Sequence, residues 1–211
     1  MHGNEIITGG LPLEEAEKVM ILLHGRGASP ENIMGLAPHL NLDGFALLAP
    51  RAVNGTWYPH SFLAPRLANE PWLGSALDMI ARLEDGLAGK GFGPHLVYFL
   101  GFSQGACLSL EFAARRAKRY GGVIAFTGGL IGEQLQPGDY RGDFAGTPVF
   151  IGSSDSDPHV PAGRVRETES IYRSLGAEIR VHIYPGMGHA VTEEEMNLVN
   201  AWMLTSAPDA R

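Results

Sequence analysis

The fold of this chain is decided by one segment, Leu96-Val97-Tyr98-Phe99-Leu100-Gly101-Phe102-Ser103-Gln104-Gly105-Ala106. The segment begins as an unbroken apolar run, which is typical of a parallel strand that is buried on both faces. It then passes through Gly-x-Ser-x-Gly into a pattern with helical spacing. This strand–turn–helix order predicts a sharp, strained turn that exposes the Ser103 hydroxyl above a sheet. We expect glycine at positions 101 and 105 because strand and helix pass too close there for a Cβ atom.

Length and composition predict a single globular domain that covers residues 1–211. Hydrophobic residues make up 45% of the chain and charged residues 18%, which excludes a disordered protein. The formal net charge of −7 argues against nucleic acid or an anionic membrane surface as the main partner. The sequence contains no stretch typical of a transmembrane helix, and residues 1–5 do not open a signal peptide, so we expect a cytoplasmic protein without integral membrane association. The sequence does not determine the oligomeric state, and a homodimer is one alternative.

The sequence gives no sign of a metal site or a cofactor. Its eight histidines contain no His-Glu-x-x-His pair, and there is no glycine-rich phosphate loop with a lysine. The only cysteine, Cys107, excludes an internal disulfide. Because it falls early in the helix after Ser103, we expect a small buried residue there rather than a thiol nucleophile.

Strands alternate with helices along the whole chain, which predicts an α/β fold with a mainly parallel central sheet flanked by helices. Expected strands cover residues 6–8 (an edge strand), 18–24, 45–50, 96–100, 123–127, 148–152 and 179–184 (near the other edge). Expected helices cover residues 30–36, 72–87, 104–120 with a stop at Gly121-Gly122, 160–175, and a last helix that Thr192 and Glu195 begin as a capping box. Residues 51–71 are irregular, and residues 132–146 form a polar surface excursion.

A serine hydroxyl becomes a good nucleophile only when a base removes its proton, and that base needs an acid to orient it. In open parallel sheets such groups lie beyond the carboxyl ends of the strands. His189 follows the strand at 179–184 in a glycine-rich loop, and the order Ser, Asp, His is the one expected of an α/β-hydrolase. The sequence therefore predicts Ser103 as the nucleophile and His189 as the base.

Two aspartates on the loop after the strand at 148–152 compete for the role of the acid. Asp157 precedes Pro158, which restricts its backbone and favours a fixed direction of the carboxylate. Asp155 is the alternative, although an aspartate in a turn often accepts hydrogen bonds from the amides of its own loop. Spacing favours Asp157 and leaves Asp155 open.

The oxyanion of such a reaction is held by two backbone N–H groups. One belongs to the residue after the nucleophile, Gln104, and the other to the loop after the first buried strand. In the loop His24-Gly25-Arg26-Gly27 we expect Arg26 to supply the second N–H group.

Four other histidines have different expected places. His24 precedes the nucleophile and is expected to anchor its own loop, and His182 lies within a strand and is expected to be structural. His60 and His159 lie in loops that border the expected pocket, where either a surface position or contact with substrate fits.

An apolar wall beside Ser103 is expected from residues that are too hydrophobic for free loops. We expect Trp57 and Tyr58 at its foundation. The candidates for substrate binding are Trp57, Tyr58, Phe62, Leu63, Leu130, Val160 and Met187.

Five segments together resemble the phospholipase/carboxylesterase family of α/β-hydrolases, which includes the acyl-protein thioesterases. They are Leu23-His24-Gly25-x-Gly27, Trp57-Tyr58-Pro59-x-x-Phe62, Gly101-Phe102-Ser103-Gln104-Gly105, Asp155-Ser156-Asp157-Pro158-x-Val160-Pro161 and Tyr184-x-Gly186-Met187-x-His189. The resemblance implies an esterase with a minimal lid, no cofactor and a shallow apolar groove. It also implies that the acid is Asp157, before proline, and that the oxyanion donors are Gln104 and Arg26.

The chain departs from the thioesterase branch at Arg26, where that branch carries leucine, and a bulky cation there argues against long-chain lipidated protein substrates. The predicted function is hydrolysis of small carboxylic esters through a Ser-His-Asp triad and an acyl-enzyme. The alternatives are an acyl thioesterase or lysophospholipase, which use the same chemistry, and a catalytically inactive binding protein with a hydrolase fold.

Overall fold

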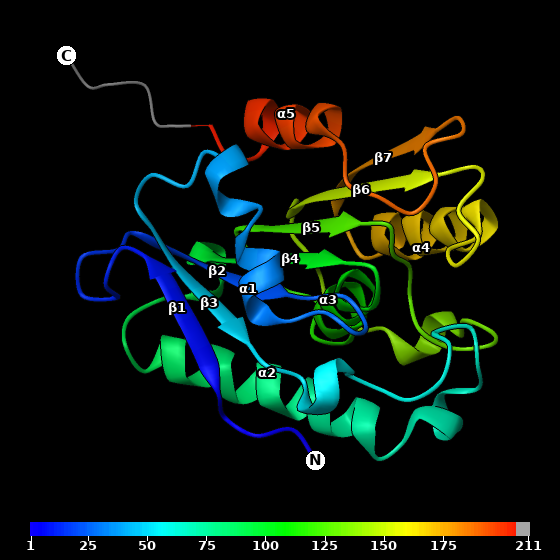
Figure 1. The fold of residues 1–211 in the computed structure, drawn as a ribbon, viewed down its shortest axis with the longest axis horizontal. Helices are drawn as coiled ribbons and strands as arrows, with labels where there is room; N and C mark the ends of the chain where they lie inside the picture. The colour runs from blue at the N-terminus through cyan, green and yellow to red at the C-terminus, as the bar shows by residue number, and fades with distance from the viewer. Residues whose placement is uncertain (206–211) are drawn as a thin grey trace.

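A computed structural model describes residues 1–205, which form one seven-stranded sheet flanked by helices (Figure 1). The strands are β1 (Ile6–Gly10), β2 (Lys18–Leu23), β3 (Phe45–Pro50), β4 (Val97–Phe102), β5 (Gly122–Phe126), β6 (Pro148–Ser154) and β7 (Glu178–Tyr184). Their spatial order is β1-β3-β2-β4-β5-β6-β7. Only β1 runs antiparallel to its neighbour, and the other pairs are parallel. The predicted α/β fold with a mainly parallel sheet is confirmed.

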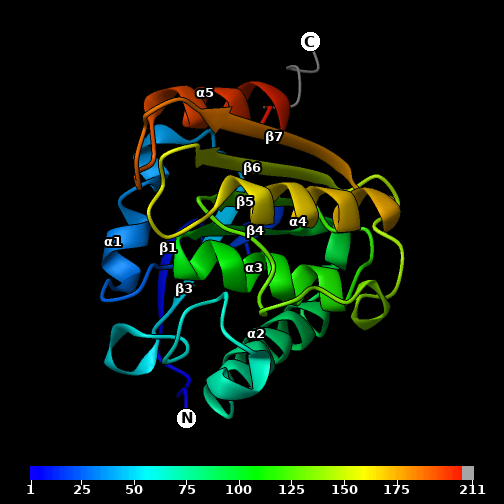
Figure 2. The same cartoon turned by 90° about the vertical axis from the view of Figure 1, so that its right-hand side faces the viewer.

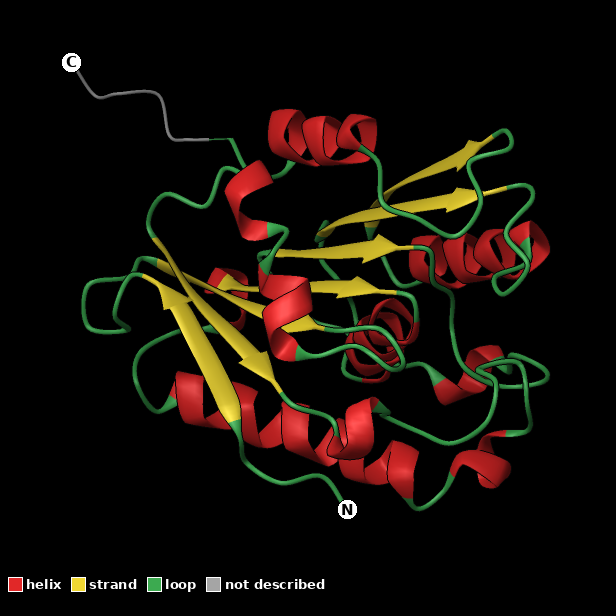
Figure 3. Cartoon of the chain, in the orientation of Figure 1, coloured by secondary structure: helices red, strands yellow, loops and turns green. Residues whose placement is uncertain are grey.

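Helices cover both faces of the sheet, as the two perpendicular views show (Figures 2 and 3). The helices are α1 (Pro30–Met34), α2 (Trp72–Ala88), α3 (Gln104–Arg115), α4 (Ala162–Ser174) and α5 (Glu193–Trp202). Helices α2, α3 and α4 pack on one face and α1 and α5 on the other, so that two apolar clusters enclose the sheet. Short 3₁₀ turns interrupt the connections at 37–39, 53–55, 66–69, 94–96 and 137–139.

The central strand β4 shows why its sequence is an unbroken apolar run. Phe99 belongs to the cluster under α3, and the next residue, Leu100, belongs to the cluster under α1 and α5. Both side chains are fully buried. A strand with a helix layer on each face has no side for polar residues, which is the pattern expected of a buried parallel strand.

The helix after Ser103 ends earlier than the sequence predicts. α3 stops at Arg115, and Arg116 leaves the helical conformation at φ −126° and ψ 42°. Gly121 and Gly122 serve the packing of a strand instead of ending a helix. A Cβ atom on Gly121 would lie 2.2 Å from the Tyr98 ring, and Gly122 begins β5. Close packing against a neighbouring aromatic ring, and not a helix stop, is therefore what requires glycine at position 121.

The carboxyl ends of the parallel strands bring four loops to one edge of the sheet. β2 leads into the loop with Arg26, β4 into the turn at Ser103, β6 into the loop with Asp157 and β7 into the loop with His189. The last loop ends at α5, whose capping box of Thr192 and Glu195 is present as predicted. Segments far apart in the chain thus meet where sites of open α/β sheets are found.

Candidate active site

Ser103 stands in a backbone conformation that few side chains adopt. Its φ of 54° and ψ of −118° lie in a strained region, at a typical cost of about 1–3 kcal/mol. The flanking glycines make the turn possible, because a Cβ atom on Gly101 would lie 2.4 Å from the carbonyl carbon of Gly105. A Cβ atom on Gly105 would lie 2.0 Å from the Leu23 carbonyl oxygen at the end of β2. The turn therefore presses α3 against two strands and lifts the serine above the sheet.

A hydrogen-bonded chain joins Ser103, His189 and Asp157. His189 Nε2 lies 2.8 Å from Ser103 Oγ, and His189 Nδ1 lies 2.7 Å from Asp157 Oδ2. An ionised carboxylate only accepts, so Nδ1–H donates to Asp157 and Nε2 is left to accept the proton of the serine hydroxyl. An imidazole held in this way is able to accept a proton from a serine hydroxyl.

The Asp157 carboxylate is held in its ionised form despite its burial. Burial opposes ionisation, but the hydrogen bond from His189 and those from the backbone N–H groups of His159 and Val160 outweigh it and lower the pKa of Asp157. The carboxyl group stays an acceptor at neutral pH and fixes the tautomer of His189.

Two residues before Asp157 hold the loop that carries His189. Asp155 Oδ1 accepts the Gly186 N–H at 2.8 Å, and Ser154 Oγ accepts the Gly188 N–H at 3.1 Å. Asp155 was expected to bond the amides of its own loop, whereas its partner lies on the neighbouring loop. The role of Ser154 was not predicted, because nothing in the sequence reveals which loop a serine at the end of a strand will face.

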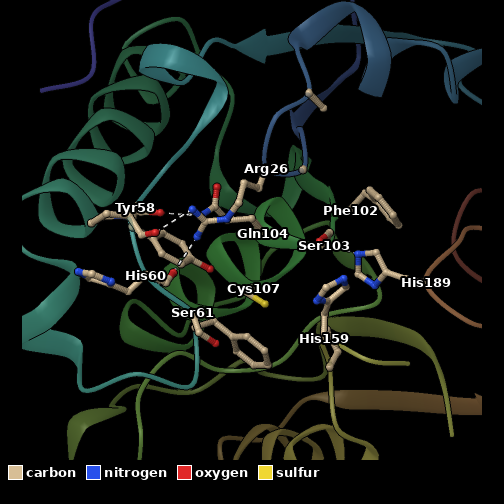
Figure 4. A pocket seen from close by; sticks show the side chains of 15 residues that line it. Arg26, Tyr58, His60, Ser61, Phe102, Ser103, Gln104, Cys107, His159 and His189 are labelled. Atoms are coloured by element: carbon tan, nitrogen blue, oxygen red, sulfur yellow. Dashed lines mark hydrogen bonds between the residues drawn. The ribbon is translucent and has the colours of Figure 1, made fainter. Parts of the chain in front are cut away.

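Two rings flank the imidazole of His189. The Phe102 ring centroid lies 5.2 Å from it, and the His159 ring meets it edge-on at 5.0 Å (Figure 4). Phe102 directly precedes Ser103 on β4, so its position could have been inferred from the motif. These contacts restrict the orientations that the His189 ring can take.

The backbone N–H groups of Gln104 and Arg26 lie on segments that border Ser103, and neither donates to an acceptor among residues 1–205. Gln104 is the first residue of α3, where N–H groups have no partner within the helix. An unpaired N–H group at the start of a helix favours an anion. Both groups are therefore available to a developing negative charge.

Gln104 also ties the start of α3 to the loop that begins at Trp57. Its Oε1 accepts the Trp57 N–H at 2.9 Å, and its Nε2 donates to the Tyr58 carbonyl at 2.8 Å. The Trp57 indole N–H donates to the His24 carbonyl at 2.8 Å, and His24 Nε2 accepts the Ala52 N–H. His24 is thus an anchor for its loop, and Trp57 supports the site from beneath.

A cavity of about 440 Å³ opens beside Ser103 and His189. Of the predicted wall, Tyr58, Phe62 and Val160 line it. His60 and His159, which the sequence left between surface and pocket, line it too, as do Pro59, Ser61, Phe102 and Cys107, which it did not select. Figure 4 shows these side chains around the opening.

Four predicted wall residues do not line the cavity. Trp57 is fully buried under it, and Leu130 is fully buried in the core, where its N–H bonds Thr168 Oγ1. Leu63 packs against the core cluster from its edge. Met187 is half-buried in the His189 loop outside the cavity lining. Closeness to a strand end does not determine which way a side chain points.

The remaining groups add no further chemistry to the site. Cys107 is buried, and burial raises the pKa of its thiol to about 12, so a thiolate is disfavoured there. Across residues 1–205 no three His, Cys, Asp or Glu side chains gather as metal ligands. In the same part of the chain no helix is long and apolar enough to cross a bilayer.

Comparison with known proteins finds relatives along nearly the whole chain. A solved phospholipase/carboxylesterase from Dyadobacter fermentans shares 46% sequence identity and a TM-score of 0.95, over 97% of this chain and 98% of that one. A putative hydrolase of Bacillus subtilis, MhqD, is 27% identical over 89% of this chain and 92% of its own length.

An acyl-protein thioesterase 1 of Gibberella zeae is 28% identical over 56% of this chain. The match spans only about half the length of that relative, 52%. The family model described as phospholipase/carboxylesterase covers residues 4–206. With its sheet order, its serine turn and a family match along nearly its whole length, the chain belongs to the phospholipase/carboxylesterase family of serine hydrolases.

Proposed function

We propose that this protein is a carboxylesterase that hydrolyses small esters through an acyl-enzyme on Ser103. The observation that carries the proposal is the hydrogen-bonded chain from Asp157 through His189 to Ser103, with the serine in a strained turn. Family membership supports hydrolase activity in general, and the geometry supports this choice of residues.

The reaction proceeds in two halves. His189 Nε2 takes the proton of Ser103 Oγ while the oxygen attacks the ester carbonyl, and the negative charge forms on the carbonyl oxygen. The N–H groups of Arg26 and Gln104 stabilise that oxyanion. His189 then gives its proton to the departing alcohol, and Asp157 stabilises the imidazolium in between. In the second half, His189 takes a proton from water as the water oxygen attacks the acyl carbon, and it returns that proton to Ser103 Oγ as the bond between Oγ and the acyl carbon breaks and the acid leaves.

A covalent serine probe tests this proposal directly. We expect a fluorophosphonate to label the wild-type protein on Ser103, and Ser103→Ala to escape labelling while it keeps the same thermal unfolding. Hydrolysis of p-nitrophenyl acetate and butyrate should depend on the same residue. Failure to label a folded wild-type protein would favour the inactive binding protein with a hydrolase fold.

A thioesterase is the second candidate, because relatives that match about half of the chain are named acyl-protein thioesterases. The same groups attack a thioester, whose leaving thiol needs less help from His189. Oxygen and thiol esters of one acyl group, compared by kcat/KM, separate the two functions. A clear preference for the thiol ester, beyond the ratio seen with hydroxide, would favour the thioesterase.

A further inference from the structure

Arg26 places a positive charge in the wall of the cavity. Its Nη1 donates to the Pro59 carbonyl at 2.8 Å and its Nη2 to the His60 carbonyl at 2.7 Å. The guanidinium carbon lies 6.0 Å from the Tyr58 ring centroid. These contacts fix the position of the charged group, and a guanidinium has further N–H groups that they do not use.

No carboxylate among residues 1–205 pairs with Arg26, and the same holds for Arg82, Arg119, Arg141 and Arg180, none of which lines the cavity. The arginines that do pair with Asp or Glu are Arg51, Arg66, Arg115, Arg116, Arg164, Arg166 and Arg173. Arg26 is also exposed and lines the cavity, so its charge is accessible to a ligand there. Its anchors are neutral carbonyls, which leave the charge of the group uncompensated.

The cavity as a whole favours an anion. Within residues 1–205 its lining contains one arginine and three histidines but no Asp or Glu, although the protein carries a net charge of −7. A cleft with one sign of charge concentrates ligands of the opposite sign. A guanidinium with free N–H groups binds a carboxylate more strongly than it binds a neutral ligand group, because the hydrogen bonds then join two charged partners.

The position of the charge points to the acyl part of the substrate. His189 must protonate the leaving alcohol, so the alcohol lies on the His189 side of Ser103. In Figure 4 the Arg26 side chain reaches away from His189, toward Tyr58 and His60. The part of the ester that extends in this direction is the acyl group.

We propose that the Arg26 side chain selects esters whose acyl part ends in a carboxylate, that is, half-esters of small dicarboxylic acids. The inference rests on the proposed esterase function and adds its substrate class. The backbone N–H group of Arg26 serves the oxyanion, and its side chain serves selection.

The test compares matched ethyl esters, followed by the release of ethanol. Monoethyl glutarate carries the charge, ethyl pentanoate has the same chain without it, and ethyl methyl glutarate has the carboxylate capped. We expect kcat/KM to favour monoethyl glutarate by about tenfold or more, since a hydrogen bond between charged groups supplies a factor of this size. The preference should fall as salt is raised. Monoethyl succinate and adipate then locate the best chain length.

Variants separate selection from loop support. Arg26→Gln should bring the ratio of monoethyl glutarate to ethyl pentanoate to about one, and Arg26→Lys should retain part of it. Arg82→Gln is the matched control. Arg82 is an exposed arginine on α2 outside the cavity, and its substitution removes the same charge from the protein. It should keep the full ratio. If Arg26 only supports the loop, Arg26→Gln lowers both rates in proportion and the ratio stays, which overturns the proposal.

Two further outcomes are decisive. Acetoxyacetate carries its carboxylate on the alcohol part. A higher kcat/KM for acetoxyacetate than for monoethyl glutarate would overturn the assignment of the Arg26 side chain to the acyl part. If wild-type protein hydrolyses ethyl pentanoate and monoethyl glutarate with equal kcat/KM, selection by Arg26 is overturned while the esterase function stays intact. If no ester is hydrolysed and the fluorophosphonate does not label Ser103, the proposed function itself fails.

Discussion

Asp155 and Asp157 lie on the same loop, and each contacts a different part of the loop that carries His189. Asp155 Oδ1 accepts the Gly186 N–H at 2.8 Å, whereas Asp157 Oδ2 lies 2.7 Å from His189 Nδ1. Two carboxylates that look interchangeable in the sequence therefore have separate roles, one toward the backbone and one toward the imidazole.

This separation predicts unequal effects of two matched substitutions. Asp157→Asn offers an amide to His189 and favours the wrong tautomer, so we expect kcat to fall by roughly a thousandfold or more. Asp155→Asn keeps an oxygen for the Gly186 N–H and should keep most activity. Ester hydrolysis and thermal unfolding of both variants provide the measurement. If Asp155→Asn is the more damaging change in folded protein, Asp157 is not the acid.

Ser103 and His189 are expected to act as one unit. Ser103→Ala and His189→Ala should each abolish nearly all ester hydrolysis, and the double variant should be hardly worse than either single one. The hydrogen bond of 2.8 Å between the two side chains is the reason, because neither can act without the other. Rates of the two single variants and the double variant test this. Losses that simply multiply would contradict a shared step.

The glycines of the serine turn should be intolerant of even one methyl group. In Gly105→Ala the new Cβ would lie 2.0 Å from the Leu23 carbonyl oxygen, which is backbone and cannot move aside. We expect a loss of at least about 3 kcal/mol in the free energy of unfolding, or no folded protein at all. Gly86→Ala on α2 is the control. It meets no atom within 4 Å and should stabilise the protein by up to about 1 kcal/mol.

The side chain of Gln104 should matter more for stability than its exposed neighbours on the cavity wall. Gln104→Leu leaves the buried Trp57 N–H and Tyr58 carbonyl without their partners. Each such group costs about 1–3 kcal/mol, so we expect the free energy of unfolding to fall by at least about 2 kcal/mol. Chemical denaturation measures the change. Ser61→Ala, on the exposed wall of the same cavity, should stay close to wild type.

Cys107 should resist thiol reagents as long as the protein is folded. Burial raises the pKa of its thiol to about 12 from an ordinary value of 9.0, so the native thiol stays protonated while the unfolded one ionises. At about pH 8 a disulfide reagent should modify only denatured protein, because the thiolate is the reactive form. Rapid modification of native protein would contradict the burial of this side chain.

The same shift predicts a dependence of stability on pH. Because the folded pKa is the higher one, Cys107 contributes stability that is fully present below pH 9.0 and is lost as pH rises toward about 12. Between these values the free energy of unfolding of Cys107→Ala should fall less steeply with pH than that of wild type, by up to about 1 kcal/mol per pH unit. Equal slopes would show that Cys107 does not cause the alkaline loss.

The sequence predicts those parts of the fold that depend on local patterns. The strand at 45–50 matches β3, and the capping box of Thr192 and Glu195 begins α5 as expected. The predicted helix stop at Gly121 was wrong. Glycine is required there by the ring of Tyr98 on a neighbouring strand, and such a contact is not visible in the local sequence. Where a pattern determines the backbone by itself, prediction succeeds.

Local sequence patterns do not predict the directions in which side chains of the loops point. Leu130 follows the carboxyl end of β5, on the side of the sheet where the site lies. Its side chain is nevertheless fully buried in the core. Arg26 was expected for its N–H group, but its bonds to the Pro59 and His60 carbonyls join loops more than thirty residues apart. Only the folded chain shows which distant carbonyls a long side chain can reach.

The position of β7 has a consequence for the dynamics of the site. β7 lies at the edge of the sheet with β6 as its sole strand neighbour, whereas β4 has a strand on either side. The strand that leads to His189 is thus held by a single ladder, and the one that leads to Ser103 by two. Edge strands open at a lower free energy than central ones. We therefore expect the contact between His189 and Ser103 to depend on the opening of β7 and to be lost on heating before the core unfolds. Amide hydrogen exchange, measured separately for β4 and β7, tests this expectation.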